Sequence, residues 1–159
     1  MRISIKGITT SAVIAAAYVV LTLPFASIAF GPIQFRVAEA FTLLPFLSPY
    51  AIYGVFIGCF VSNMLFSTPI DMIVGSLATL AAAIITYKCK KIYFAALPPI
   101  IINALAIGTM LAVMADNFSP LLLLSYMGSL ALSQFIVCFV LGIPFTKLLQ
   151  KYKIDRYMK

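Results

Sequence analysis

Few strongly polar side chains lie within or against the long apolar runs of this sequence, and these are the positions where chemistry is possible. Glu39 is the most informative of them, because an ionisable group at membrane depth is costly and usually functional. Its carboxylate can accept two parallel hydrogen bonds from adjacent N–H groups, such as the N1–H and exocyclic amine of a guanine ring. Arg36 lies three residues earlier, on the same face of a helix, so a mutual ion pair is the structural alternative.

The other candidate ligand groups are amides, one further acid and aromatic rings. Gln34 and Arg36 could close over a site as a lid, whereas Asp71 is also consistent with a helix cap or a first-turn acid. The amides could instead join helices inside a membrane, and rings such as Phe35 could stack on a planar ligand. The predicted substrate-binding set is Gln34, Arg36, Glu39, Asn63, Asp71, Asn103, Tyr126 and Gln134.

Several kinds of chemistry lack the residues they need. The chain has no histidine and only four acidic residues, and it contains no P-loop, H-E-x-x-H or G-x-S-x-G motif. We therefore expect no metal, no cofactor, no ATP binding by this chain itself and no enzymatic activity. Cys59, Cys89 and Cys138 lie far apart and predict neither a disulfide framework nor a metal site.

The composition is that of a membrane protein. Hydrophobic residues make up 64% of the 159 residues and charged residues 9%, whereas soluble domains carry roughly 25% charged residues. The basic and then apolar N-terminus resembles a signal peptide, but its apolar stretch continues to about Phe30, so we expect a retained first helix. The sequence predicts a single all-α integral membrane domain over residues 1–159.

Six apolar segments are predicted to be helical, and the second is predicted to be short or partly buried. Their expected ranges are Ile8–Ile28 with a kink at Pro24, Val37–Leu47, Tyr50–Phe66, Asp71–Tyr87, Pro98–Ala115 and Leu121–Leu149. Small residues recur every four positions and predict close helix contacts. These stripes are Ala12 and Ala16; Gly54, Gly58 and Ser62; Gly75, Thr79 and Ala83; and Ala104, Gly108 and Ala112.

The basic residues indicate the orientation in the membrane. Ten of the eleven Lys and Arg residues fall within three clusters, at residues 2–6, 88–91 and 147–159. This is the pattern of cytoplasmic loops, so the net charge of +7 does not point to nucleic acid as a partner. Six crossings place both termini and all three clusters inside, and the loops that carry Arg36, Asp71 and Asp116 outside.

Three stretches of the sequence also resemble a known family. The motifs G-P-I-Q-F-R-x-x-E-A at residues 31–40 and L-P-P-x-x-x-N-A at residues 97–104, with the stretch GSLATLAAAIITY, closely resemble the QueT family over roughly residues 12–144. These proteins are the substrate-binding S components of energy-coupling factor (ECF) transporters for queuosine precursors. The resemblance implies an S-component-like bundle in a prokaryotic cell membrane. Its implied ligand groups are Gln34, Arg36, Glu39, Asn63 and Asn103, with Glu39 reading the guanine edge of a 7-deazaguanine.

The resemblance also implies partners. An ECF transmembrane coupling protein would dock on Ala12 and Ala16, and two cytoplasmic ATPases would drive release of the ligand. Gln134 departs from the family pattern, in which a glutamate is common at this position. Because a neutral amide cannot pair with an ammonium as a carboxylate can, the expected ligands include 7-aminomethyl-7-deazaguanine, queuine, queuosine and their relatives.

Two alternatives of other classes remain at this point. An intramembrane enzyme acting on a lipid or small amphiphile would need an assembled nucleophile or general base, and the sequence contains no recognisable set. A structural bundle or small channel would need a sustained polar stripe along several helices, whereas the polar residues here are sparse.

Overall fold

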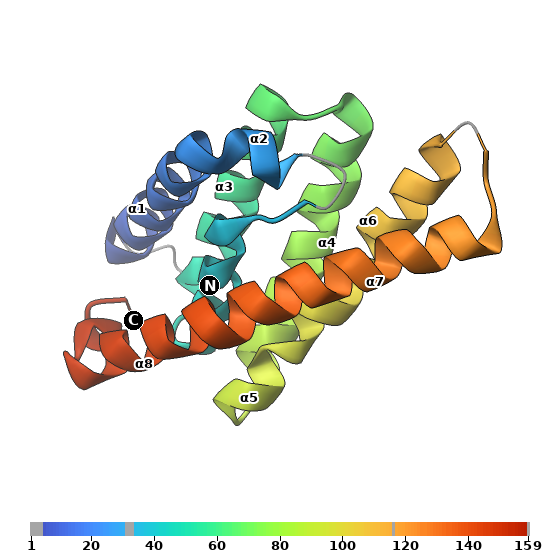
Figure 1. Ribbon diagram of the computed structural model, residues 1–159. Coiled ribbons are helices and arrows are strands. Elements are labelled where there is room, and N and C mark those ends of the chain that lie inside the picture. The colour runs from blue at the N-terminus through green and yellow to red at the C-terminus, as the bar shows by residue number, and fades with distance from the viewer. Residues whose placement is uncertain (1–4, 31–33, 116, 159) are drawn as a thin grey trace.

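The computed structural model describes residues 5–30, 34–115 and 117–158, and these residues form an all-helical bundle (Figure 1). Most elements are α-helices, whereas η1, η2 and η4 are 3-10 helices and η3 is a π-helix. The elements are α1 (Ile5–Thr22), η1 (Leu23–Phe25), α2 (Ala26–Ala29), η2 (Val37–Phe46), α3 (Tyr50–Phe66), α4 (Pro69–Lys88), α5 (Ile92–Ala95), α6 (Leu97–Met114), α7 (Pro120–Ile136), η3 (Val137–Gly142), α8 (Ile143–Lys151) and η4 (Ile154–Arg156).

The observed helices agree with the expected ranges to within a few residues. The third expected segment, Tyr50–Phe66, is helical over its whole length. The expected kink at Pro24 is the 3-10 turn η1, which separates α1 from α2. Proline occupies the first turn of α6, as predicted, because the missing N–H has no partner there in any case. Arg2, residues 31–33, Asp116 and Lys159 lie outside the described residues.

The short second segment is a 3-10 helix inside the bundle. Ten residues at about 2.0 Å each extend only about 20 Å, less than a hydrocarbon core of about 30 Å. Seven of them are buried, which is the partly buried helix that the sequence predicted. A 3-10 helix of this length is uncommon and often marks a functional segment. It contacts α1, α3, α4 and η3, so it lies among the helices and not on their outside.

Small residues allow the first and third helices to approach closely. A Cβ added at Gly58 would lie 2.6 Å from Tyr18 Cβ, and one at Gly54 would lie 2.7 Å from Ile14 Cβ. A similar contact joins α6 to α7, where a Cβ at Gly108 would lie 2.8 Å from Met127 Cγ. The three predicted stripes that contain glycine are therefore sites of close packing, whereas Ala12 and Ala16 are exposed on α1 and do not pack within the described bundle.

α7, η3 and α8 form one long rod, drawn in orange to red across the front of Figure 1. It runs from Pro120 to Lys151, and its middle turn, η3, is a π-helix. Gly142 of η3 packs against η2, since a Cβ there would lie 3.2 Å from the Ala40 carbonyl oxygen. Such π-helical turns are frequent at functional sites.

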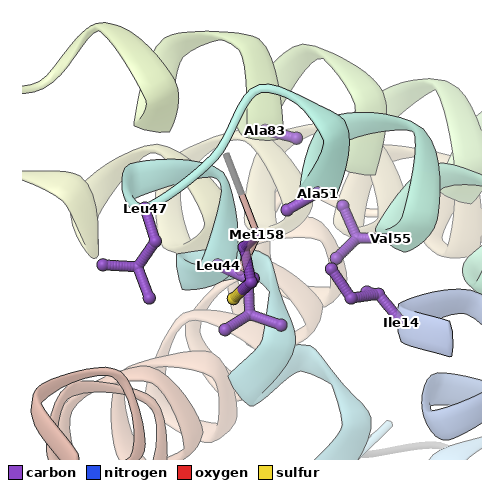
Figure 2. Close-up of a cluster of buried hydrophobic side chains, with 7 residues drawn as sticks. All are labelled: Ile14, Leu44, Leu47, Ala51, Val55, Ala83 and Met158. Carbon is purple, nitrogen blue, oxygen red and sulfur yellow. The ribbon is translucent and has the colours of Figure 1, made fainter. Parts of the chain in front are cut away.

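The C-terminal segment packs into the main apolar core. Figure 2 shows Met158 beside Leu44 of η2, with Ile14 of α1 and Val55 of α3 in the same cluster. The Ser48 hydroxyl donates a hydrogen bond to the Met158 carbonyl. The C-terminus, α1 and η2 are thereby held together at one end of the bundle.

Four helical stretches are long and apolar enough to cross a membrane. They are Ile5–Ala29, Pro69–Lys88, Ile92–Met114 and Pro120–Lys151, while Val37–Phe46 and Tyr50–Phe66 are shorter apolar helices. Many large apolar side chains on these helices are exposed, as expected for a surface that faces lipid. In Figure 1, α5 and α8 lie at the lower edge and the α3–α4 turn at the upper edge.

Candidate functional site

Glu39 is enclosed within the bundle. It lies in the first turn of η2 and is 0% exposed. The Tyr18 hydroxyl of α1 donates a hydrogen bond to Oε1 at 2.7 Å, and Asn103 Nδ2 of α6 donates to Oε2 at 3.3 Å. Three elements far apart in the sequence therefore meet at one carboxylate, which is turned away from the lipid.

No cation pairs with this carboxylate among the described residues, where the one salt bridge joins Arg36 to Asp71. Burying an unpaired carboxylate is costly unless hydrogen bonds compensate for the lost water. Each Glu39 oxygen accepts one hydrogen bond here, although a carboxylate can accept about four. The group therefore keeps capacity to accept further N–H donors.

Arg36 forms a second polar centre, distinct from Glu39. Its Nη2 donates to Asp71 Oδ2 at 2.8 Å and to Gln34 Oε1 at 3.1 Å. Its Nη1 donates to Asn63 Oδ1 at 3.1 Å, and its Nε to the Ala29 carbonyl at 3.3 Å. Four hydrogen bonds thus occupy the guanidinium, whose side chain joins the 34–36 loop to α2, α3 and α4. We call Gln34, Arg36, Asn63 and Asp71 the arginine clamp.

The expected alternative of an Arg36–Glu39 ion pair is wrong. That expectation required both residues on one helix, but η2 begins only at Val37 and the Arg36 backbone is extended, with φ −99° and ψ 95°. The extended backbone lets the Arg36 side chain reach α3 and α4, and its charge is compensated by Asp71. Glu39 consequently remains outside the salt bridge.

Asp71 is a first-turn acid of α4, and the helix cap is Thr68, whose hydroxyl accepts from the Asp71 N–H at 3.3 Å. Ser67 donates to Asp71 Oδ2, while Oδ1 is buried with no hydrogen-bond partner in the described part of the chain. Gly75 leaves room for this cluster, because a Cβ there would lie 2.9 Å from Asp71 Oδ1.

The loop before η2 is also attached to α7. Gln34 adopts a left-handed backbone with φ 47°, which is uncommon for a residue other than glycine. Its carbonyl accepts a hydrogen bond from the Ser133 hydroxyl at 3.4 Å. Both Gln34 and Arg36 are 4% exposed, so these two loop residues are buried against the bundle in this structure.

Gln134 is buried on α7 and connects to η2 through two side chains. Cys138 Sγ lies 3.8 Å from Gln134 Oε1 and 4.0 Å from Thr42 Oγ1. Thr42 in turn donates to the carbonyl of Glu39 at 2.6 Å. Gln134 is thus linked to the backbone of the Glu39 turn.

Two aromatic residues that were predicted to contact the ligand are not hydrogen-bonded to the polar groups described above, in the part of the chain that the structure describes. Tyr126 is half-buried on α7, and no hydrogen bond joins its hydroxyl to the clamp or to Glu39 within the described residues. Phe35 is also half-buried. Sequence reasoning missed Tyr18, because its position in the middle of an apolar helix indicates packing, and only the structure places its hydroxyl beside Glu39 and its ring beside Gly58.

The pair predicted for docking lies on the outside of the bundle. Ala12 and Ala16 are both exposed on α1, one helical turn apart. The neighbouring residues Ile14, Ala15 and Tyr18 are buried. This stripe therefore does not pack against the rest of the described chain.

Comparison with known proteins identifies the family. Residues 8–151 match the QueT transporter family. A curated relative from Lactococcus lactis subsp. cremoris (strain MG1363), named queuosine precursor transporter QueT, is 47% identical over 75 residues. The aligned stretch covers 46% of this chain and 44% of that relative, so the match spans less than half of the relative's length. No solved structure matches the chain significantly. Because the family match runs through every long helix and both polar centres, this chain belongs to the QueT transporter family.

Proposed function

We propose that this protein is the membrane-embedded S component of an ECF importer and that it captures a 7-deazaguanine from outside the cell. The observation that carries the proposal is the Glu39 carboxylate, which is fully buried, has no cationic partner in the described residues and is held by Tyr18 and Asn103. Membership of a transporter family favours this role over an intramembrane enzyme.

The chemistry of Glu39 suits the guanine edge. The N1–H and exocyclic amine of a 7-deazaguanine present two parallel donors, which match the two oxygens of a carboxylate. Inside a bundle, these bonds form at low dielectric and are stronger than in water. A nanomolar ligand requires about 12 kcal/mol of binding free energy, and a flat base buried with both polar edges paired is a reasonable source of it.

The arginine clamp suits the role of a gate more than that of a primary ligand contact. Its guanidinium is occupied by four protein hydrogen bonds, and Gln34 also bonds to α7 through its carbonyl. Entry of a ligand to the enclosed Glu39 then requires the 34–36 loop to lift. The proposed ligand contacts are therefore Glu39 and Asn103, together with Tyr126 and Gln134 on α7. The arginine clamp would close the entrance to this site.

The proposed topology has six crossings with both termini in the cytoplasm. The exposed positions of Lys6, Lys88, Lys147 and Lys151 at helix ends agree with it. Cys89 offers a direct test, because it is half-buried beside Lys88 whereas Cys59 and Cys138 are buried. A membrane-impermeant maleimide should label Cys89 only after the cells are permeabilised. Labelling in intact cells would place this loop outside and overturn the topology.

The proposed partners are a transmembrane coupling protein and two cytoplasmic ATPases. Ala12 and Ala16 present a smooth, exposed strip on α1 that permits close approach of another helix. Replacing Ala12 by leucine should abolish transport while leaving ligand binding intact. Loss of binding in that variant would instead place Ala12 near the ligand.

Native mass spectrometry of the gently purified protein tests the proposal as a whole. We expect a co-purified deazaguanine, together with the coupling protein and ATPases when these are co-expressed. A bound lipid substrate and no deazaguanine, even after addition of 7-aminomethyl-7-deazaguanine, would contradict the proposed function.

A further inference from the structure

The geometry points to Asn103 as a specificity-determining residue that reads the exocyclic amine of the ligand, next to the carboxylate that reads its ring N–H. This inference rests on the proposed function and assigns the already proposed contact Asn103 a specific role, the reading of the ligand's exocyclic amine by its Oδ1 atom. It is carried by an unsatisfied atom, Asn103 Oδ1, which is buried and has no hydrogen-bond partner among the described residues.

The orientation of the Asn103 amide follows from its contact with Glu39. Asn103 Nδ2 donates to Glu39 Oε2 at 3.3 Å, so the NH2 end of the amide faces the carboxyl group. The other end of the same planar amide is then the acceptor Oδ1. Leaving a buried acceptor unpaired destabilises the protein, because the atom has lost its bond to water and gained none in return. A ligand that offers an N–H to Oδ1 recovers this cost on binding.

Tyr18 fixes the carboxylate from the opposite side. Its hydroxyl bonds Oε1 at 2.7 Å, while Asn103 bonds Oε2. Glu39 is thereby held by α1 and α6 at once and cannot rotate without breaking one of the two bonds. The result is a preorganised group of three acceptors, the two carboxylate oxygens and Asn103 Oδ1, which the Nδ2–Oε2 hydrogen bond keeps close together.

Three neighbouring acceptors suit one particular set of donors. A 2-amino-4-oxopyrimidine edge carries three N–H bonds, one on the ring and two on the amine. The carboxylate can take the ring N–H and the nearer amine N–H, and Asn103 Oδ1 can take the farther amine N–H. A base of the hypoxanthine type lacks the amine, and a base methylated on the amine replaces one of its N–H bonds with a methyl group. Both leave a buried acceptor unpaired.

Calorimetric titration of the purified protein with three probes tests the inference. The probes are 7-aminomethyl-7-deazaguanine, its analogue lacking the 2-amino group and its N2-methyl analogue. In the unmodified protein, we expect the 2-deamino analogue to bind at least about 100-fold more weakly than the parent, because sites built around a hydrogen bond strongly reject ligands without it. We expect the N2-methyl analogue to bind at least about tenfold more weakly.

The Asn103→Ala variant gives the sharper result. It removes the acceptor and opens space for a methyl group, so the N2-methyl analogue should bind at least as well as the parent. Asn63→Ala is the matched control, since it removes a buried amide from the arginine clamp. That variant should keep the preference for the parent over the N2-methyl analogue, whatever its overall affinity.

The possible outcomes separate this inference from the proposed function. If the unmodified protein binds none of the three probes, the proposed function fails and the inference fails with it. If it binds the parent but does not discriminate against the N2-methyl analogue, or if Asn103→Ala keeps the original preference, only the role of Asn103 is overturned. Should Asn103→Ala not fold, the probe series on the unmodified protein decides alone.

Discussion

Arg36 is paired with Asp71, 35 positions away, and not with Glu39, which follows it by three positions. This pairing divides the polar interior into two centres. The arginine clamp ties the 34–36 loop to α3 and α4, whereas Glu39 is held by neutral donors only. The arginine clamp suits closure of the binding site, and Glu39 suits binding of a ligand that supplies N–H donors.

Breaking the clamp should destabilise the protein. Arg36→Met leaves the buried Asp71 carboxylate without its cation, which typically costs 3–5 kcal/mol. We expect a lower free energy of unfolding, measured in detergent micelles by denaturant titration. The double variant Arg36→Met with Asp71→Leu should recover much of this loss, because no uncompensated charge remains. Equal stability of Arg36→Met and the unmodified protein would contradict the clamp.

Close approach of α1 and α3 at Gly58 should be sensitive to a single methyl group. An added Cβ would lie 2.6 Å from Tyr18 Cβ and 3.1 Å from the Ala15 carbonyl, so α1 must shift. Gly58→Ala should cost about 1–3 kcal/mol of stability. Gly128→Ala on α7 is the control, as a Cβ there meets nothing within 4 Å and alanine favours helix by up to about 1 kcal/mol. Equal effects of the two substitutions would refute the tight contact.

Tyr18 should act on the ligand only through Glu39. Tyr18→Phe removes the hydroxyl that bonds Oε1 and keeps the ring, so affinity for 7-aminomethyl-7-deazaguanine should fall about tenfold. Calorimetry in the Glu39→Gln background provides the discriminating measurement, since a positioning role predicts that the same substitution has much less effect there. An unchanged tenfold loss in both backgrounds would assign Tyr18 a role independent of the carboxylate.

A carboxylate at position 134 should change which deazaguanine binds best. Gln134 is buried on α7 and linked through Cys138 and Thr42 to the Glu39 turn. Gln134→Glu should strengthen binding of the cationic aminomethyl compound about tenfold relative to its neutral 7-methyl analogue. Gln150→Glu on the exposed face of α8 is the control for a general charge effect. If Gln134→Glu leaves the ratio of the two affinities unchanged, the ligand's ammonium group does not lie near position 134.

Much of the fold could be predicted because the bilayer restricts what a chain can form. Long apolar runs, prolines and glycine stripes predicted the third helix at Tyr50–Phe66, the kink at Pro24 and the contact made by Gly58. The 3-10 form of η2 could not be predicted, because local propensity does not distinguish it from a short α-helix. It depends on the helices that enclose it on several sides.

The candidate site could be predicted only in part. Glu39, Asn103 and Asp71 stood out because polar groups are rare in this sequence. Which of these groups pair with one another could not be predicted. The partner of Arg36, for example, depends on where η2 begins and on which helices its side chain can reach. Tyr18 was missed because a tyrosine in an apolar helix reads as packing until its hydroxyl is placed beside a carboxylate.

The most direct test of the central claim is calorimetric titration of the Glu39→Gln variant with 7-aminomethyl-7-deazaguanine, beside the unmodified protein. Glutamine keeps the size of the side chain but replaces one acceptor with a donor. This N–H group would face a ligand N–H, and two donors cannot form a hydrogen bond with each other. We predict an affinity loss of at least about 30-fold, or about 2 kcal/mol, with an unchanged unfolding midpoint as the check on folding. Equal affinity in the two proteins would contradict the claim that Glu39 grips the ligand.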